Sequence, residues 1–464
     1  MSAIQVSMFS YTKIAALRVL ESLIMICSIL LLLSWPLKHT IALRNISLVL
    51  GFCSSFLWLL LARPVLSLKN LAPPLLLLCV PLWLVIEYLF FPLAPSIQFA
   101  ELTSLWVRVV LAVPFAFVCG ILINRCRVFL RLFIAVSCVY PAIPVLMSLY
   151  GQLLGGAWLP GPEYIFKTKV SGVYWLMWSC SLGFALMHRA LLQSEYSQIH
   201  QRKNWPLILV SAYLICFSLF DFFLLNALNG ILIGLAVGSV LLSVYMQRFF
   251  TKTHLRRRPL YLLSLAIVLS GLLGVGAIYK GHSADYSNKL APLYWDIKAS
   301  LDIDKTKTWQ RSDQVRGLPD PKNDLGNFVN VSAYERASWL IKGFSLLLQN
   351  PLGTGYTSQA FHYFMSKEYP GSTVQKTHCG WLDMALGLGI PGIMFLCLAI
   401  GSILFLAYQA LKADQCGINI GILWMLGTMF LLWWPAELGE REYIESLFYV
   451  AALFAGALIK LPKE

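Results

Sequence analysis

Charged residues are scarce in this sequence. They make up 12% of the 464 residues, whereas hydrophobic residues make up 58%. A soluble domain usually carries about a quarter charged residues. This shortage excludes an ordinary soluble protein, and the many long apolar runs indicate a chain that crosses a membrane repeatedly.

Recognisable metal and disulfide patterns are also missing. The eleven cysteines fall mostly inside apolar runs, and no C-x-x-C pair or Cys/His cluster is present. We therefore expect neither disulfides nor a zinc site. We also expect a metal-independent protein without a cofactor. The first apolar segment is long enough to span, and we expect no cleavable signal peptide.

Cations are abundant but unevenly placed. The net charge is +14, and the basic residues cluster in short connections such as 125–127, 202–203 and 254–258. The alternate connections hold few of them. This asymmetry follows the positive-inside rule, so it orients the chain and does not indicate a nucleic-acid partner. It predicts cytoplasmic N- and C-termini.

Hydropathy predicts an all-α, polytopic membrane protein of about twelve spans, since a transmembrane helix needs about 20 apolar residues. The ninth and tenth spans enclose a loop that is too long for a simple connection and is therefore expected to be functional. It lies on the periplasmic side if the termini are cytoplasmic, and it divides the chain into parts 1–280, 281–378 and 379–464. The expected spans are 14–34, 40–62, 71–93, 102–123, 128–150, 170–192, 205–225, 227–247, 259–279, 380–409, 418–435 and 443–460.

The second half of this loop has a helical pattern. Ser332 followed by Glu335 has the spacing of a capping box, and Asn350-Pro351 ends the helix. The segment 283–330 before it is predicted to be irregular and chemically uninformative. The apolar residues of the expected helix are Tyr334, Trp339, Leu340, Phe344, Leu347 and Leu348.

Two spaced motifs follow one another in the loop. Arg336 to Leu340 reads R-x3-L, and His378, ten residues and Gly389 read H-x10-G. In this order, within a large loop of a polytopic membrane protein, they resemble the bacterial O-antigen ligase family over roughly 332–392. The wider superfamily also contains O-antigen polymerases and O-linked oligosaccharyltransferases.

The resemblance implies a glycosyltransferase of the bacterial inner membrane. Its donor would be polysaccharide on undecaprenyl pyrophosphate, and its acceptor a hydroxyl of lipid A-core, with surrounding membrane lipids as further partners. His378 would take the acceptor proton, and Arg336 and Arg441 would hold the pyrophosphate. A single displacement would invert the anomeric configuration. Glu437 is the nearest match to an acidic residue that such ligases carry beside this arginine.

One departure from the family concerns a cation. Such ligases carry an arginine where this sequence has Asn229, and asparagine supplies hydrogen bonds but no charge. Either Arg108, Lys167 or Lys169 supplies the missing charge, or the chain is a divergent member of the family with an altered donor. A Glu87–Arg108 pair would also explain how two ionisable groups are tolerated inside spans.

Other interpretations remain open. Trp339 and Trp381 have the character of interfacial anchors, and Glu335 that of a helix cap alone. A polymerase would extend another lipid-linked unit, and a protein O-oligosaccharyltransferase would modify serine or threonine. A polysaccharide transporter would show broken helices in pairs and internal symmetry, and the sequence shows neither.

Overall fold

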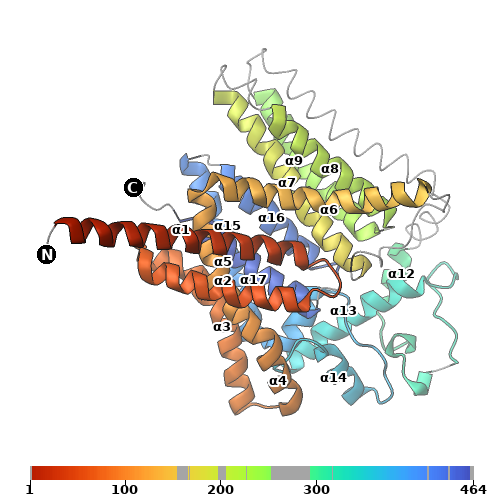
Figure 1. Cartoon of the computed structure of the whole chain (residues 1–464). Coiled ribbons are helices and arrows are strands. Elements are labelled where there is room, and N and C mark those ends of the chain that lie inside the picture. The colour runs from red at the N-terminus through yellow and green to blue at the C-terminus, as the bar shows by residue number, and fades with distance from the viewer. Residues whose placement is uncertain are drawn as a thin grey trace.

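The chain folds into helices, as the hydropathy predicts. The computed structural model describes residues 3–153, 166, 168–196, 205–225, 227–251, 293–315, 317–414, 417–436 and 439–459. Within these ranges there is no β-strand beyond isolated bridges (Figure 1). The expectation of an all-α polytopic protein is confirmed. The helices outside the large loop are α1 (Ala3–Ser34), α2 (Ile41–Ala62), α3 (Leu68–Phe90), α4 (Pro95–Glu101), α5 (Val107–Arg125), α6 (Arg127–Leu153), α7 (Lys169–Tyr196), α8 (Trp205–Leu224), α9 (Leu228–Thr251), α15 (Gly380–Asp414), α16 (Gly417–Leu432) and α17 (Arg441–Ala457).

Eight helices in the described ranges are long and apolar enough to cross a membrane. Shorter apolar stretches lie within α9 and α16. Each expected span falls on a helix, except 259–279, which lies outside the described residues. The count of twelve therefore stays a prediction.

The helices α5 and α17 form the centre of the bundle. They pack side by side, and α17 is buried from Tyr443 to Ala457. Gly120 of α5 faces the backbone of α17, and Gly456 of α17 faces the backbone of α5, so a Cβ at either position would collide with main-chain atoms. Small residues permit this close approach of helices. The pairing fixes the start of α17, which carries several of the expected site residues.

The long helix α15 is broken at Gly389. This glycine has φ 66° and ψ 177°, and a Cβ there would collide with the carbonyl oxygen of Leu352. The backbone groups that lose their helical partners at the break are hydrogen-bonded to the loop after α13. The Ile390 N–H donates to the Pro351 carbonyl (2.7 Å), and the Thr354 N–H donates to the Leu386 carbonyl (3.0 Å). The glycine at the end of the second motif therefore allows both the break and the close approach of the loop backbone.

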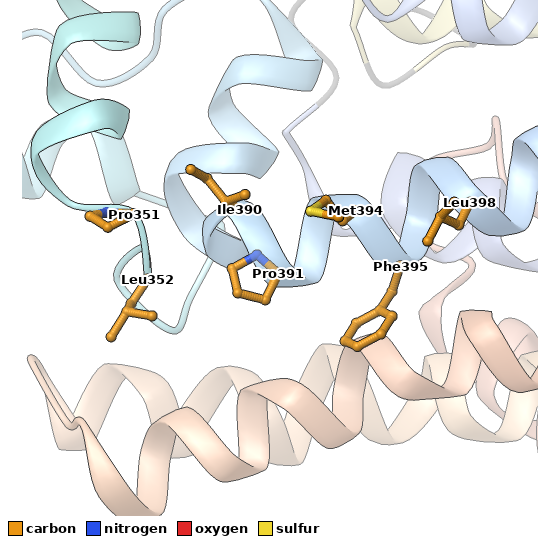
Figure 2. A pocket seen from close by; sticks show the side chains of 7 residues that line it. All are labelled: Pro351, Leu352, Ile390, Pro391, Met394, Phe395 and Leu398. Atoms are coloured by element: carbon orange, nitrogen blue, oxygen red, sulfur yellow. The ribbon is translucent and has the colours of Figure 1, made fainter.

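An apolar groove opens beside this break. Its volume is about 410 Å³, and its lining is almost entirely apolar. Figure 2 shows the loop after α13 (Val331–Gln349) supplying one wall and α15 the other. Met394 and Leu398 are each 54% exposed, so the groove reaches the surface of a membrane-spanning helix. The lining residues are Pro351, Leu352, Ile390, Pro391, Met394, Phe395 and Leu398.

A buried carboxylate attaches this loop to the membrane helices. Glu101, at the end of α4, accepts hydrogen bonds from the Thr357 N–H and hydroxyl, both at 2.7 Å, and from the Ser358 N–H at 3.0 Å. Gln98 donates to the Thr354 carbonyl (3.0 Å). These four bonds pair polar groups that would be costly to bury alone, and they hold the segment after α13 in place.

The large loop is more ordered than the sequence suggests. The prediction of an irregular segment is wrong where the chain forms α12 (Leu293–Ser300) and two 3₁₀ turns, Thr308–Gln310 and Asp313–Val315. Buried Asp296 organises it by accepting from the Asn323 side chain and the Asn330 N–H. In Figure 1, α12, α13 and α14 (Ala360–Glu368) lie at the opposite side of the molecule from the start of α1.

The helix α13 forms where it was expected, but its start and its buried face differ. Asn330 is the N-cap, with its side chain accepting from the Ala333 N–H, so the capping box at Ser332 is wrong. Phe344 and Leu348 are exposed, at 44% and 76%. Helical spacing predicts one apolar stripe, but it does not tell which part of the stripe meets a partner.

Candidate functional site

His378 occupies the turn that leads into α15. Its φ is 60°, which is rare for a residue with a side chain, and it is half-buried. The imidazole stacks on the indole of Trp339 from α13, with ring centroids 5.3 Å apart and planes 18° apart. A backbone in this region costs about 1–3 kcal/mol and persists only where its surroundings fix it. The stack joins the two expected motifs in space.

The residues on either side of His378 are hydrogen-bonded. Thr377 donates its N–H and its hydroxyl to one oxygen of Asp383, both at 2.8 Å. The hydroxyl oxygen of Thr377 also accepts the Cys379 N–H at 3.1 Å. The turn that carries the imidazole is thus attached to the first turns of α15.

Trp339 is a buried platform. It is 5% exposed, and its indole N–H donates to the Trp309 carbonyl (2.8 Å). Trp381 is equally buried and donates to the Phe430 carbonyl (2.8 Å). The interpretation of these two tryptophans as interfacial anchors is wrong, because both indoles are enclosed by protein.

Arg311 is a site residue that the sequence did not indicate. Its guanidinium lies 5.6 Å from the centre of the Trp339 ring, and it makes two hydrogen bonds to Glu335, at 2.8 and 2.5 Å. These bonds raise the pKa of Arg311. Glu335 is therefore an ion-pair partner and not a helix cap. No local pattern reveals this pair, because its members are 24 residues apart.

Arg336 is exposed on α13. It precedes Trp339 by three residues, so the two side chains are neighbours on the helix surface. Within the described ranges no hydrogen bond or ion pair involves its guanidinium. An exposed cation of this kind is available to a phosphate oxygen.

The connection between α16 and α17 gathers further expected residues. The Gly380 N–H, two residues after His378, donates to the Ala436 carbonyl (3.0 Å). Asn229, at the start of α9, donates to the Pro435 carbonyl (2.8 Å). Arg441 opens α17 and is exposed. One connection therefore meets the start of α15, Asn229 and the helix that Arg441 begins. Glu437 and Lys167 lie outside the described residues.

The expected Glu87–Arg108 pair is wrong. Arg108 instead contacts Glu445 of α17 (Nη1 to Oε2, 3.6 Å) and donates from Nε to the Ser104 carbonyl (2.9 Å). The close packing of α5 on α17 places Glu445 beside Arg108. Glu87 on α3 is 1% exposed, and its Oε2 has no hydrogen-bond partner in the described ranges.

A second ion pair ties the start of α17 to the bundle. Arg44 of α2 lies 3.8 Å from Glu442, measured from Nη2 to Oε1, and is 5% exposed. Arg44 and Arg108 thus pin the first turns of α17 through Glu442 and Glu445. In the part of the chain that the structure describes, no three Asp, Glu, His or Cys side chains gather to hold a metal ion.

Part of the chain is similar to a known protein family. No curated protein matches the sequence. Residues 209–397 match the family model described as O-antigen ligase, a stretch that begins within α8 and ends within α15. It contains both motifs, Asn229, Arg311 and every lining residue of the groove beside Gly389 except Leu398. Over this stretch, which is less than half of the chain, the sequence is similar to the O-antigen ligase family.

Proposed function

We propose that this protein is the ligase that transfers O-antigen polysaccharide from undecaprenyl pyrophosphate to lipid A-core. The reaction would take place at the periplasmic face of the bacterial inner membrane. The observation that carries the proposal is the stack of His378 on Trp339, with the exposed guanidinium of Arg336 on the next turn of the same helix. A base and a cation on neighbouring elements are what glycosyl transfer from a pyrophosphate requires.

The steps follow from these side chains. His378 accepts the proton of the acceptor hydroxyl as its oxygen bonds to the anomeric carbon of the donor sugar. The bond from that carbon to the pyrophosphate oxygen breaks, and the electron pair leaves with the pyrophosphate. Arg336 and Arg441 stabilise the growing negative charge. One displacement inverts the anomeric configuration, and no metal or cofactor enters a step.

The remaining expected residues take supporting roles in this proposal. Asn229 binds the Pro435 carbonyl and so orders the connection before Arg441. Arg108 is neutralised by Glu445, and it fixes α17 more directly than it would hold phosphate. Glu437 stays a predicted substrate-binding residue.

The groove beside Gly389 suits a lipid-linked donor. Its volume of about 410 Å³ falls in the range of small-molecule sites, which is about 300–1,000 Å³. Its apolar lining on a membrane-spanning helix matches a hydrocarbon chain. Such a chain could lie against α15 while its pyrophosphate reaches the start of the same helix.

A polymerase or a protein O-oligosaccharyltransferase would use the same donor and the same base. The acceptor alone separates these reactions, and the family match is shared by ligase and polymerase chemistry at this level. A transporter is less favoured, because the His378 imidazole, the Trp339 indole and Arg336 lie in the large loop and near helix starts.

The lipopolysaccharide of a deletion strain tests the proposal. We expect polymer to disappear from lipid A-core while long lipid-linked chains persist, and the wild-type gene to restore the ladder. Shortened lipid-linked chains would indicate a polymerase instead. An unchanged ladder with lost protein glycans would indicate a protein O-oligosaccharyltransferase.

A further inference from the structure

Asp383 is a buried carboxylate close to the proposed base. It lies in the first turns of α15 and is 4% exposed. One oxygen accepts both bonds from Thr377, and the other has no hydrogen-bond partner in the described ranges. A half-satisfied buried carboxylate is costly. Among the described residues, the carboxylate is hydrogen-bonded only to the turn that carries His378.

These hydrogen bonds fix the residues immediately before and after His378. Asp383 holds Thr377 directly, and it holds Cys379 through the Thr377 hydroxyl, which accepts the Cys379 N–H. The residue between them is the one with φ 60°. Backbone of this kind returns to the ordinary region when its neighbours are released.

The stack on Trp339 depends on this backbone. The imidazole reaches the indole from a turn that Asp383 keeps closed. Other ionisable groups lie near the turn. Lys376 and His378 interact electrostatically with the Asp383 carboxylate. Arg311, which is paired with Glu335, lies over the Trp339 ring. Asp383 is hydrogen-bonded directly to Thr377, which precedes His378.

We infer that Asp383 is a positioning residue for glycosyl transfer, which keeps the His378 imidazole against Trp339 and aimed at the acceptor hydroxyl. This inference rests on the proposed function, in which His378 is the base. This positioning role requires an acceptor oxygen at residue 383 within hydrogen-bond distance of Thr377, because it depends on the two bonds that Thr377 donates. Asparagine offers the same acceptor oxygen, and alanine offers none.

The test compares paired substitutions in the purified full-length protein. We expect Asp383→Ala and Thr377→Val to lower kcat about a hundredfold, as small misplacements of a catalytic group do, with the KM for the donor unchanged. Asp383→Asn and Thr377→Ser should restore most of kcat. The double variant Asp383→Ala with Thr377→Val should be no worse than Asp383→Ala alone, since both remove one unit.

Other outcomes would overturn the inference. If Asp383→Asn is as inactive as Asp383→Ala, or if the two losses multiply in the double variant, Asp383 does not act through Thr377. Thr377→Val keeps the comparison valid where Asp383→Ala yields little folded protein. A rise in donor KM with kcat unchanged would place Asp383 in binding and contradict positioning.

A second readout is independent of transfer. Diethyl pyrocarbonate modifies accessible imidazoles, and mass spectrometry reports the rate at His378 itself. We expect faster modification in Asp383→Ala and Thr377→Val, and the wild-type rate in Asp383→Asn. Equal rates in all variants would overturn the inference. If His378→Ala transfers as well as wild type, the proposed function fails, while these rates still decide whether Asp383 holds the turn.

Discussion

At the scale of single residues, the five arginines discussed above fall into two groups, those that form an ion pair with a glutamate in the part of the chain that the structure describes and those that do not. Arg311, Arg108 and Arg44 each face a glutamate. Arg336 and Arg441 are exposed and make no ion pair in the described ranges. The positive charge of a paired guanidinium is balanced by the carboxylate of its partner. Arg336 and Arg441 are therefore the better phosphate ligands.

Replacing Arg336 should weaken donor binding. A hydrogen bond to a charged group contributes about 1.5–3 kcal/mol, so Arg336→Ala should raise the donor KM about tenfold or more, since 1.4 kcal/mol is tenfold. Lys367→Ala, an exposed cation on α14, is the matched control and should leave KM unchanged. A wild-type kcat/KM for the donor in Arg336→Ala would remove Arg336 from the site.

The site residues that the sequence predicts belong to local motifs, whereas those that it misses depend on contacts between residues distant in the chain. His378 and Arg336 follow from two local motifs, and the structure joins their helices through Trp339. Arg311 was missed because its partner Glu335 is distant in the chain. The Glu87–Arg108 pair was wrong because α5 packs on α17 at this level, a choice that the charges of α3 and α5 do not reveal.

At the scale of elements, the Arg311–Glu335 pair holds the first part of the large loop on α13. Arg311→Met would leave Glu335, with a side chain 6% exposed, without its cation. An unsatisfied buried group costs about 1–3 kcal/mol, and more if charged. We expect a lower melting temperature in detergent and faster protease cleavage within 293–330.

Lys298→Met is the control for Arg311→Met. Lys298 pairs with Asp324, but both side chains are about half exposed. Exposed ion pairs contribute little, so the melting temperature should not change. Equal loss in both variants would contradict the role given to Arg311.

The break in α15 also makes a testable element. Gly389→Ala adds a Cβ that collides with the Leu352 carbonyl, in a backbone conformation that is nearly restricted to glycine and costs an L-residue about 1–3 kcal/mol by itself. Gly401→Ala on the same helix meets nothing within 4 Å. Thermal unfolding should show a marked loss for Gly389→Ala and none for Gly401→Ala. Equal stability of the two variants would mean that the loop and the break are not locked together.

At the scale of the whole molecule, hydropathy predicts the helices well because membrane spans must be long and apolar. It could not predict the fold of the loop. Segment 293–330 is held by Asp296, Trp309 and Arg311 through contacts with distant residues. Such contacts leave no periodic pattern, which is why this segment was expected to be irregular.

The orientation of the whole chain in the membrane can be tested by labelling cysteines on each side. In a variant without native cysteines, Leu325→Cys in the large loop should react with a membrane-impermeant maleimide on spheroplasts. Lys412→Cys, near the end of α15, should react only after permeabilisation. Both positions are exposed, so access to solvent does not separate them. The reverse pattern would invert the topology and exclude a periplasmic site.

The most direct measurement of the central claim is transfer by the purified protein from a defined undecaprenyl-pyrophosphate donor to lipid A-core. Wild type and His378→Ala are compared at equal amounts of folded protein. The account predicts an inverted glycosidic product with wild type, and a loss of at least about a hundredfold with His378→Ala, the contribution typical of general-base catalysis. Full activity of His378→Ala would contradict it, because no other residue in the account accepts the proton.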